Sequence, residues 1–468
     1  MTSGKTGPRP ATETLDWTMG RIFLFWLPLA ATWLMMAAEG PFLSAVIARM
    51  ADPKFNLAAY GVAFSIALLV EAPIIMIMSA ASALVRDRDS FGKVKRFTYS
   101  LNAIITLIML LILIPPVFSL IAQDLIKLPP DLARLTHISC IILLPWPGVI
   151  GYRRFYQGIL IRNNRTRFVA YGTILRLAAM AGTAPVLHQF YQLAGAHVGA
   201  AALSAGVTIE AVASRIMARR VVRDLISETG PARTDLSYRF ITTFYLPLAL
   251  TAVLALGIRP IVTFFLGMGR MPVESLAVFP VVHALTFVFS SFALSFQEVV
   301  IALAGDRFEN YLVLKKFAVR LAVFVFCGLG LINFTPLAGV WFQGISGLSP
   351  DLAEFAIPPA RILTIIPLLW VWLCFQRAIL MIGRVTAPIT KSTGLQVLLV
   401  MLSLFILINF TNLVGITAAS IALLAGAAAV PLYLLPSYNR VLFRHADRTA
   451  FRNKLTSTPG LSRNSSVD

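Results

Sequence analysis

Long apolar stretches recur along the chain and are separated by short polar segments. Twelve of them reach the length of about 20 apolar residues that an α-helix needs to cross the bilayer. They lie near 21–48, 57–84, 97–123, 136–160, 168–188, 196–218, 240–267, 275–303, 317–342, 353–381, 388–410 and 413–437. The polar stretch 1–20 lacks the basic-then-apolar order of a signal peptide, so the first span is expected to stay in the mature protein. The pattern predicts an all-α polytopic membrane protein with twelve transmembrane helices.

The twelve spans fall into two halves with related sequences. Leu27-Pro28-Leu29-Ala30 in the first span recurs as Leu246-Pro247-Leu248-Ala249 in the seventh, at an offset of 219 residues. Three further matches follow in the same order: Lys95-Arg96-Phe97 with Lys315-Lys316-Phe317, Phe155, Ile159 and Leu160 with Phe375, Ile379 and Leu380, and Val198-Gly199 with Val414-Gly415. Because six is even, both halves enter the membrane from the same side and form parallel repeats.

The repeat predicts where the domains begin and end. We expect a six-helix lobe at 21–218, a second six-helix lobe at 239–437 and a linker at 219–238, with polar tails at 1–20 and 438–468. Such a pair of lobes is typical of transporters that alternate around a central site.

Composition and charge narrow the class of protein. Hydrophobic residues make up 58% of the chain and charged residues 13%, which excludes an ordinary soluble enzyme. The net charge of +19 is distributed unevenly: 32 of the 40 Lys and Arg lie in the two tails and in the loops after even-numbered spans, and five lie on the other side. The asymmetry predicts a protein of the plasma or inner membrane with both termini cytoplasmic, next to anionic lipids. It gives no reason to expect a nucleic-acid partner.

Enzyme chemistry and bound metal are not expected. The three cysteines Cys140, Cys327 and Cys374 lie in apolar runs, and the chain has no paired Cys or His spacing and no glycine-rich phosphate loop. We therefore expect no catalytic residues, no metal site and no cofactor.

Charged residues within the spans are candidates for function, since each costs about 2.5–3.5 kcal/mol on insertion scales. Arg176 and Glu210 lie at similar depths of neighbouring spans, so we expect a structural ion pair. Glu71 lies mid-membrane before Pro73 and is predicted either to couple transport to an ion or to stay neutral and hydrogen-bonded. Glu298 lies near the inner mouth, where solvent can reach it.

Four further groups lie in the outer half of the membrane, at depths that would let them meet in the cleft between the lobes: Glu39, Arg259, His283 and Arg361. One interpretation is a Glu39–Arg259 salt bridge that holds the lobes together. The other is a substrate site, in which the arginines bind anionic oxygens and Glu39 or His283 takes the coupling proton.

Several stretches resemble a known family. They are residues 57–65, Pro247 with the following Leu248-Ala249-Leu250, Arg259-Pro260-Ile261-Val262, Ala277-Val278 with Pro280-Val281 and His283, Arg361-Ile362 with Pro367, and Arg86-Asp87-Arg88. The chain resembles the progressive ankylosis protein family within the multidrug/oligosaccharidyl-lipid/polysaccharide exporter superfamily. The resemblance implies a fold of two six-helix bundles and export of anions such as pyrophosphate, nucleotide or citrate. The chain departs from that family's pattern around Glu71-Ala72-Pro73.

The leading hypothesis is therefore a secondary active exporter of small organic or phosphorylated anions that works by alternating access. A proton or sodium gradient or the membrane potential would supply the energy, because no nucleotide-binding motif is present. The alternatives are a proton- or sodium-coupled extruder of cationic drugs, which would use Glu39 and Glu71, and a flippase of lipid-linked precursors.

Overall fold

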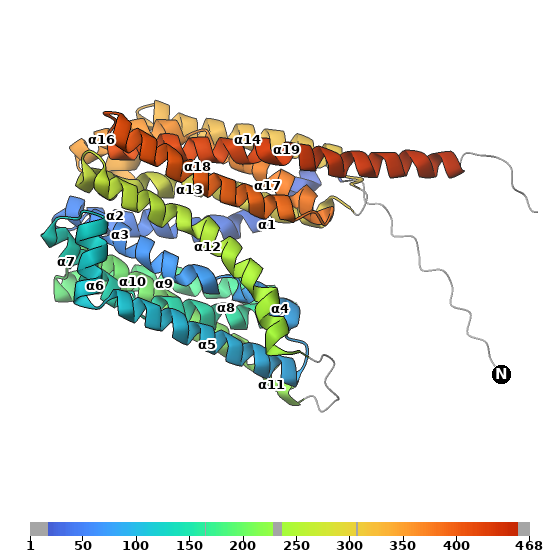
Figure 1. Ribbon diagram of the computed structural model, residues 1–468, viewed down its shortest axis with the longest axis horizontal. Coiled ribbons are helices and arrows are strands. Elements are labelled where there is room, and N and C mark those ends of the chain that lie inside the picture. The colour runs from blue at the N-terminus through green and yellow to red at the C-terminus, as the bar shows by residue number, and fades with distance from the viewer. Residues whose placement is uncertain (1–16, 164, 228–235, 306–307, 457–468) are drawn as a thin grey trace, which may run out of the picture.

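The structure, a computed structural model, describes residues 17–163, 165–227, 236–305 and 308–456, with side chains as far as Phe443. Within these ranges the fold is helical and contains no strand, and twelve helical segments are long and apolar enough to cross a membrane (Figure 1). The predicted all-α membrane fold with twelve transmembrane helices is confirmed.

The first half contains six spans, three of which are divided into consecutive shorter helices. Its elements are α1 (Met19–Ala37), α2 (Glu39–Ala48), α3 (Pro53–Glu71), the 3-10 turn η1 (Ala72–Ile74), α4 (Ile77–Leu84), α5 (Arg88–Ile112), α6 (Pro115–Ser119), the π-helical turn η2 (Leu120–Leu125), α7 (Pro130–Ile142), α8 (Trp146–Arg162), α9 (Thr166–Tyr191) and α10 (Gly195–Met217). A short helix, α11 (Arg219–Ser227), follows within the predicted linker.

The second half repeats this order. Its elements are α12 (Tyr238–Met268), α13 (Pro272–Leu303), α14 (Tyr311–Phe334), α15 (Leu337–Gly339), the π-helical turn η3 (Val340–Ile345), α16 (Pro350–Leu363), α17 (Ile366–Ile382), α18 (Ala387–Phe410) and α19 (Gly415–Thr456). α19 continues well beyond residue 437, where the second lobe was predicted to end.

The irregular backbone also repeats. η2 and η3 are both π-helical turns and begin 220 residues apart, at Leu120 and Val340. Asp52 and Met271, each followed by the proline that opens a span, both have positive φ, at 48° and 53°. Turn geometry that recurs at the offset of the sequence matches agrees with a duplication of one six-helix unit.

The third and ninth spans begin about nine and six residues earlier than the hydropathy pattern predicts. The third was placed at 97–123, but α5 begins at Arg88 because Asp87 and Ser90 form a capping box that supports a polar first turn. It ends at Ile112, ahead of Pro115, since proline cannot continue a helix. The ninth, placed at 317–342, is α14 and ends ahead of Pro336 for the same reason.

The first span of each half crosses to the other half. The N-terminal part of α1 packs on α13, where Trp26 donates a hydrogen bond to Ser295 Oγ (2.8 Å) and contacts the rings of Phe292 and Phe317. α12 begins against the first half, where Tyr245 contacts Phe97, and ends against α18 and α19 (Figure 1). The two halves are therefore joined by two crossing helices.

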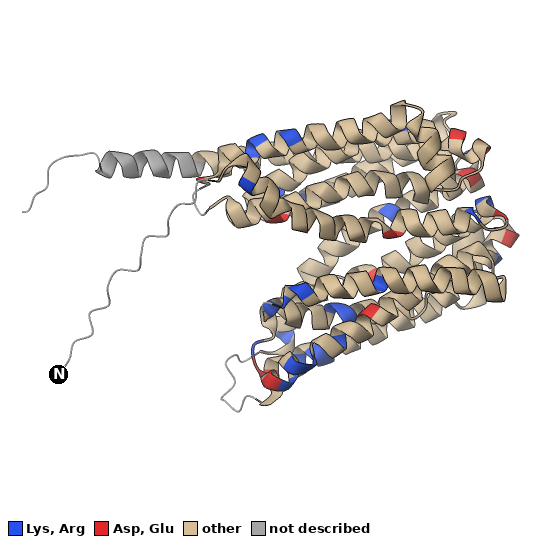
Figure 2. Ribbon diagram, turned by 180° about the vertical axis from the view of Figure 1, so that it is seen from behind, with Lys and Arg blue, Asp and Glu red and all other residues tan. Residues whose placement is uncertain are grey.

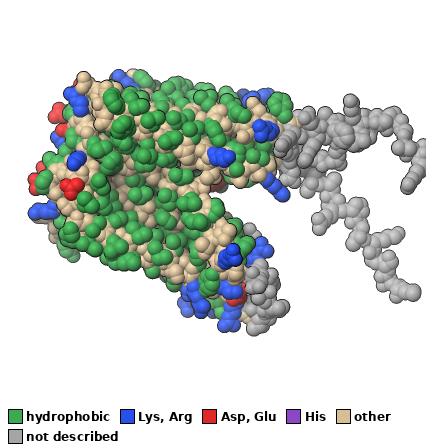
Figure 3. Space-filling model, viewed as in Figure 1, with side chains coloured by type: hydrophobic (Ala, Val, Ile, Leu, Met, Phe, Trp, Pro, Cys, Tyr) green, Lys and Arg blue, Asp and Glu red, His purple; other side chains and the backbone are tan. Residues whose placement is uncertain are grey.

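The halves meet at one end of the molecule and separate at the other. They lie together at the end that carries α2, α7 and α16, here named the closed end, and diverge toward α4 and α11, the open end (Figure 1). The space-filling view shows a hollow between the halves at the open end (Figure 3). Basic residues gather at the open end (Figure 2).

Candidate functional site

A network of buried charges occupies the interior of the first half. Glu210 on α10 forms salt bridges with Arg153 on α8 and Arg176 on α9, and its other oxygen accepts a hydrogen bond from Gln157 (3.0 Å). Arg176 also forms a salt bridge with Glu39 at the start of α2. These five residues are named the buried charge network; Glu210 has a side-chain exposure of 1%. Because several kcal/mol are needed to dehydrate each ion, the mutual pairing is what makes these charges tolerable inside the protein.

The network includes one expected contact and one unexpected residue. Arg176 Nε lies 3.4 Å from Glu210 Oε2, the pair expected from matched depth. Arg153 was counted with the basic residues of the loop after the fourth span, although the span expected at 136–160 includes it, and it lies inside α8. It is nine residues before Arg162, the last residue of that helix, which corresponds to about 13 Å of helix rise. The apolar run Gly158 to Ile161 between them was the signal that could have placed Arg153 in the membrane.

Glu71 lies outside this network. It ends α3 at the break before η1, is 2% exposed, and has one carboxyl oxygen without a hydrogen-bond partner. Among the described residues it forms no salt bridge. The break is contacted from the other half, because the Tyr245 hydroxyl on α12 donates a hydrogen bond to the carbonyl of Pro73 (2.6 Å). Glu71 is therefore a buried carboxyl group two residues from a hydrogen bond that joins the halves.

Arg259 does not pair with Glu39, so the interpretation of these two residues as a salt bridge between the lobes is wrong. Glu39 faces α9 and pairs with Arg176, whereas Arg259 on α12 lies over the ring of Phe64 on α3, with its guanidinium carbon 4.5 Å from the ring centroid. The ring centroid of Phe279 on α13 lies 6.0 Å from the same guanidinium carbon. Among the described residues Arg259 has no carboxylate partner, and its Nε lacks a hydrogen bond. Cation–π contacts hold it between the halves.

The four outer-half candidates do not form one cluster. His283 lies near Arg259, since its ring centroid is 5.6 Å from that of Phe279. Arg361 on α16 instead donates a hydrogen bond from Nε to the carbonyl of Asn333 (3.1 Å) and lies over Phe334, which are residues of α14. Of the four residues, only Arg259 and His283 share a neighbour, which is Phe279. Equal depth in the membrane does not determine which way each helix faces, so it does not by itself predict a contact.

Polar contacts join the halves at the closed end. Arg49, after α2, donates hydrogen bonds to the carbonyls of Gly344 (2.6 Å) and Ile345 (2.9 Å) in η3. Lys54 at the start of α3 forms a salt bridge of 2.5 Å with Glu274 at the start of α13. These contacts, named the closed-end latch, link turns that each belong to a different half.

Below the latch the helices approach closely. The Ser65 hydroxyl lies 2.8 Å from the Thr263 hydroxyl across the interface between α3 and α12. A Cβ atom at Gly61 would come within 2.8 Å of Pro280 Cγ on α13. Small residues of this kind let transmembrane helices pack backbone to backbone. The closed end is therefore sealed by packing as well as by charge.

Comparisons with known proteins bear on the fold. No protein-family model and no curated protein matches the sequence. Among solved structures, the inward-facing conformation of a multidrug resistance MATE family transporter of the MOP superfamily matches with a TM-score of 0.68, 16% identity and coverage of 91% of this chain and 99% of that one. The outward-facing conformation of such a transporter matches with a TM-score of 0.62, 15% identity and coverage of 94% and 100%.

A third solved structure is a MOP superfamily transporter from Pyrococcus furiosus Vc1, whose binding pocket is described as having a reverse polarity that suggests a different function. It matches with a TM-score of 0.59, 15% identity and coverage of 92% of this chain and 100% of that one. The matches cover 99–100% of these proteins and at least 91% of this chain, so the likeness includes both halves. The chain has the fold of the MATE transporters of the MOP superfamily.

Proposed function

We propose that the protein is a secondary active transporter that exports small organic or phosphorylated anions by alternating access between its two halves. The described conformation has a latched closed end and a hollow at the open end (Figure 3). We assign the open end to the cytoplasm, with both termini there, because basic residues gather at that end. The hollow is then the route by which substrate enters from inside the cell.

The polarity of the interface supports an anionic substrate. The acids of the buried charge network, Glu39 and Glu210, are each neutralised by an arginine. Arg259 lies between the halves against two aromatic rings, has no carboxylate partner among the described residues and has an Nε without a hydrogen bond, and this is the observation that carries the proposal. A guanidinium group binds carboxylate or phosphate through two parallel hydrogen bonds. Pocket polarity also varies within this fold, as the Pyrococcus furiosus protein illustrates.

Coupling to a proton or a sodium ion is the second part of the proposal. Glu71 is buried beside the Tyr245 contact with Pro73, and Glu39 belongs to a network that includes groups on four helices. Buried acids in transporters commonly serve as relays for protons. We propose that Glu71 and Glu39 exchange the coupling ion when the halves move and water reaches them.

Extrusion of cationic drugs is the second candidate function. The MATE neighbours described as multidrug resistance transporters favour it, as does an aromatic–acid pair at the open end, where Trp33 donates a hydrogen bond to Glu298 (3.0 Å). An exposed carboxylate beside an indole ring is a suitable first contact for an organic cation.

Counterflow in proteoliposomes separates the two functions. Vesicles would be loaded with pyrophosphate, ATP or citrate in one series and with an ethidium-like cation in the other. We expect anion exchange by the natural protein and a loss of at least about tenfold in Arg259→Lys, because lysine keeps the charge but lacks the planar fork. Glu298→Gln is the matched control and should leave anion exchange within about twofold.

The opposite pattern would contradict the proposal. Normal anion exchange in a well-folded Arg259→Lys protein would remove the anion-binding role of that residue. Cation exchange that is abolished by Glu298→Gln and unaffected by Arg259→Lys would identify a drug extruder.

A further inference from the structure

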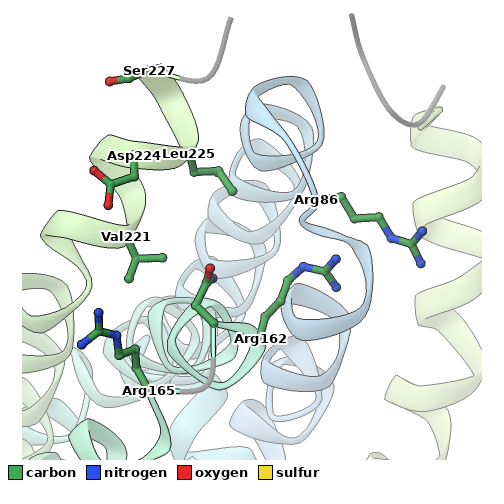
Figure 4. Close-up of a pocket in the computed structure, with 8 residues that line it drawn as sticks. Arg86, Arg162, Arg165, Val221, Asp224, Leu225 and Ser227 are labelled. Carbon is green, nitrogen blue, oxygen red and sulfur yellow. The ribbon is translucent and has the colours of Figure 1, made fainter. Parts of the chain in front are cut away.

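A separate basic pocket lies at the open end, outside the interface between the halves. It has a volume of about 850 Å³ and is lined by residues of the α4–α5 connection, the α8–α9 connection and α11: Arg86, Arg162, Asn163, Arg165, Val221, Asp224, Leu225 and Ser227. Figure 4 shows Arg86 and Arg162 on one side and Arg165 below Val221 and Asp224 on the other. We propose that this pocket binds a phosphate group, as the headgroup of an anionic phospholipid or as a free phosphorylated compound.

The donors in the pocket match that chemistry. Three guanidinium groups against one carboxylate give the lining a net charge of +2, counting Arg and Asp as charged. Arg162 donates one hydrogen bond to the carbonyl of Ser82 (3.0 Å) and has further N–H groups to offer. Among the described residues, none of the three arginines forms a salt bridge with Asp224 or with any other carboxylate. Phosphate oxygens are acceptors that arginine binds with high geometric specificity.

The location matches a headgroup. Four membrane spans end beside the pocket, at Leu84, Arg88, Arg162 and Thr166. α11 forms a further wall of the pocket. It is an amphipathic helix that buries Val222 against the first half, while Arg219, Arg220 and Arg223 are exposed. Helices of this kind lie in the headgroup region with basic side chains toward anionic lipid.

The arginines are more numerous in the first half, although the fold repeats, because the α17–α18 connection carries only Arg384. At the offset of 220 residues, Arg162 corresponds to Ile382 and Arg165 to Val385. A general requirement for positive charge at this face of the membrane would act on both halves alike. The difference indicates that these arginines serve a ligand of the first half and its connector, and not only the orientation of the chain.

Native mass spectrometry of the full chain in detergent tests the proposal. The protein would be titrated with dioctanoyl phosphatidylglycerol, with dioctanoyl phosphatidylcholine, and with glycerol 3-phosphate. We expect saturable binding of a phosphate ligand that is weakened at least about tenfold in the triple variant Arg86→Gln, Arg162→Gln, Arg165→Gln, since charge-assisted hydrogen bonds are lost. Stronger binding of the lipid than of glycerol 3-phosphate would identify a headgroup site, and the reverse order a site for a free phosphate.

Matched variants keep the test decisive. Arg88→Gln, Arg96→Gln and Arg167→Gln remove the same charge from exposed positions that do not line the pocket, and should change affinity by less than about threefold. Asp224→Asn removes the carboxylate that repels the ligand and should strengthen binding. The proposal would be overturned if the two triple variants lost affinity equally. It would also be overturned if neither the pocket triple variant nor Asp224→Asn changed the affinity.

Discussion

Replacement of Glu210 by glutamine should destabilise the protein more than any other single change of a buried acid. Glu210 neutralises both Arg153 and Arg176 and is 1% exposed, so the substitution leaves two arginines with only Glu39 as a carboxylate partner. Removing one member of a buried ion pair costs about 3–5 kcal/mol. We expect a loss of this size in the free energy of unfolding, measured by titration of the purified protein from mild detergent into dodecyl sulfate.

Glu71→Gln is the matched control for this prediction. Glu71 is also buried, at 2% exposure, but has no salt bridge among the described residues, so the same change should cost less than about 1 kcal/mol. Adding Arg153→Gln to Glu210→Gln should recover part of the loss, with a coupling energy of about 0.5–3 kcal/mol. Equal losses from Glu210→Gln and Glu71→Gln, or strictly additive effects of the Glu210 and Arg153 changes, would refute the network as described.

Two further predictions concern the closed end and the orientation. On a Ser65→Cys background, Lys54→Glu should raise thiol reactivity about 1.5- to 5-fold, the population shift that corresponds to the 0.2–1 kcal/mol of a partly exposed ion pair. Adding Glu274→Lys should reverse the increase, and no reversal would show that the pair does not hold the closed end. A cysteine at exposed Asn412 should react with an impermeant reagent on intact cells and one at exposed Thr166 should not; the opposite result would invert the assignment of the open end to the cytoplasm.

The number of spans and the duplication could be predicted because each rests on a one-dimensional signal. Apolar length defines a span, and the Leu-Pro-Leu-Ala repeat aligns the halves. Span ends were less accurate, because the capping box at Asp87 lets a polar segment begin α5. The helices that cross between the halves left no signal in the sequence, since an apolar surface is the same whether it contacts lipid or another helix.

The candidate site could be predicted only in part, for a similar reason. Depth in the membrane follows from counting residues, and it correctly predicted the contact between Arg176 and Glu210. The direction in which a side chain faces depends on the rotation of each helix, which counting does not give. Glu39 therefore contacts Arg176 and not Arg259, and Arg361 contacts Asn333 on α14. Arg153 was missed because a basic residue near the end of a span was assigned to the loop.

The crossing of α1 onto α13 has a consequence for biosynthesis. Trp26 and its hydrogen-bond partner Ser295 are separated by 269 residues, so at about 5–20 residues per second the ribosome needs roughly 13–54 s to deliver the partner after Trp26 has emerged. Throughout this interval the N-terminal part of α1 lacks α13, the helix on which it packs, and the indole N–H of Trp26 must find a temporary acceptor. Insertion of this protein therefore includes a waiting period for its first helix, during which the translocation machinery or a membrane chaperone must retain it.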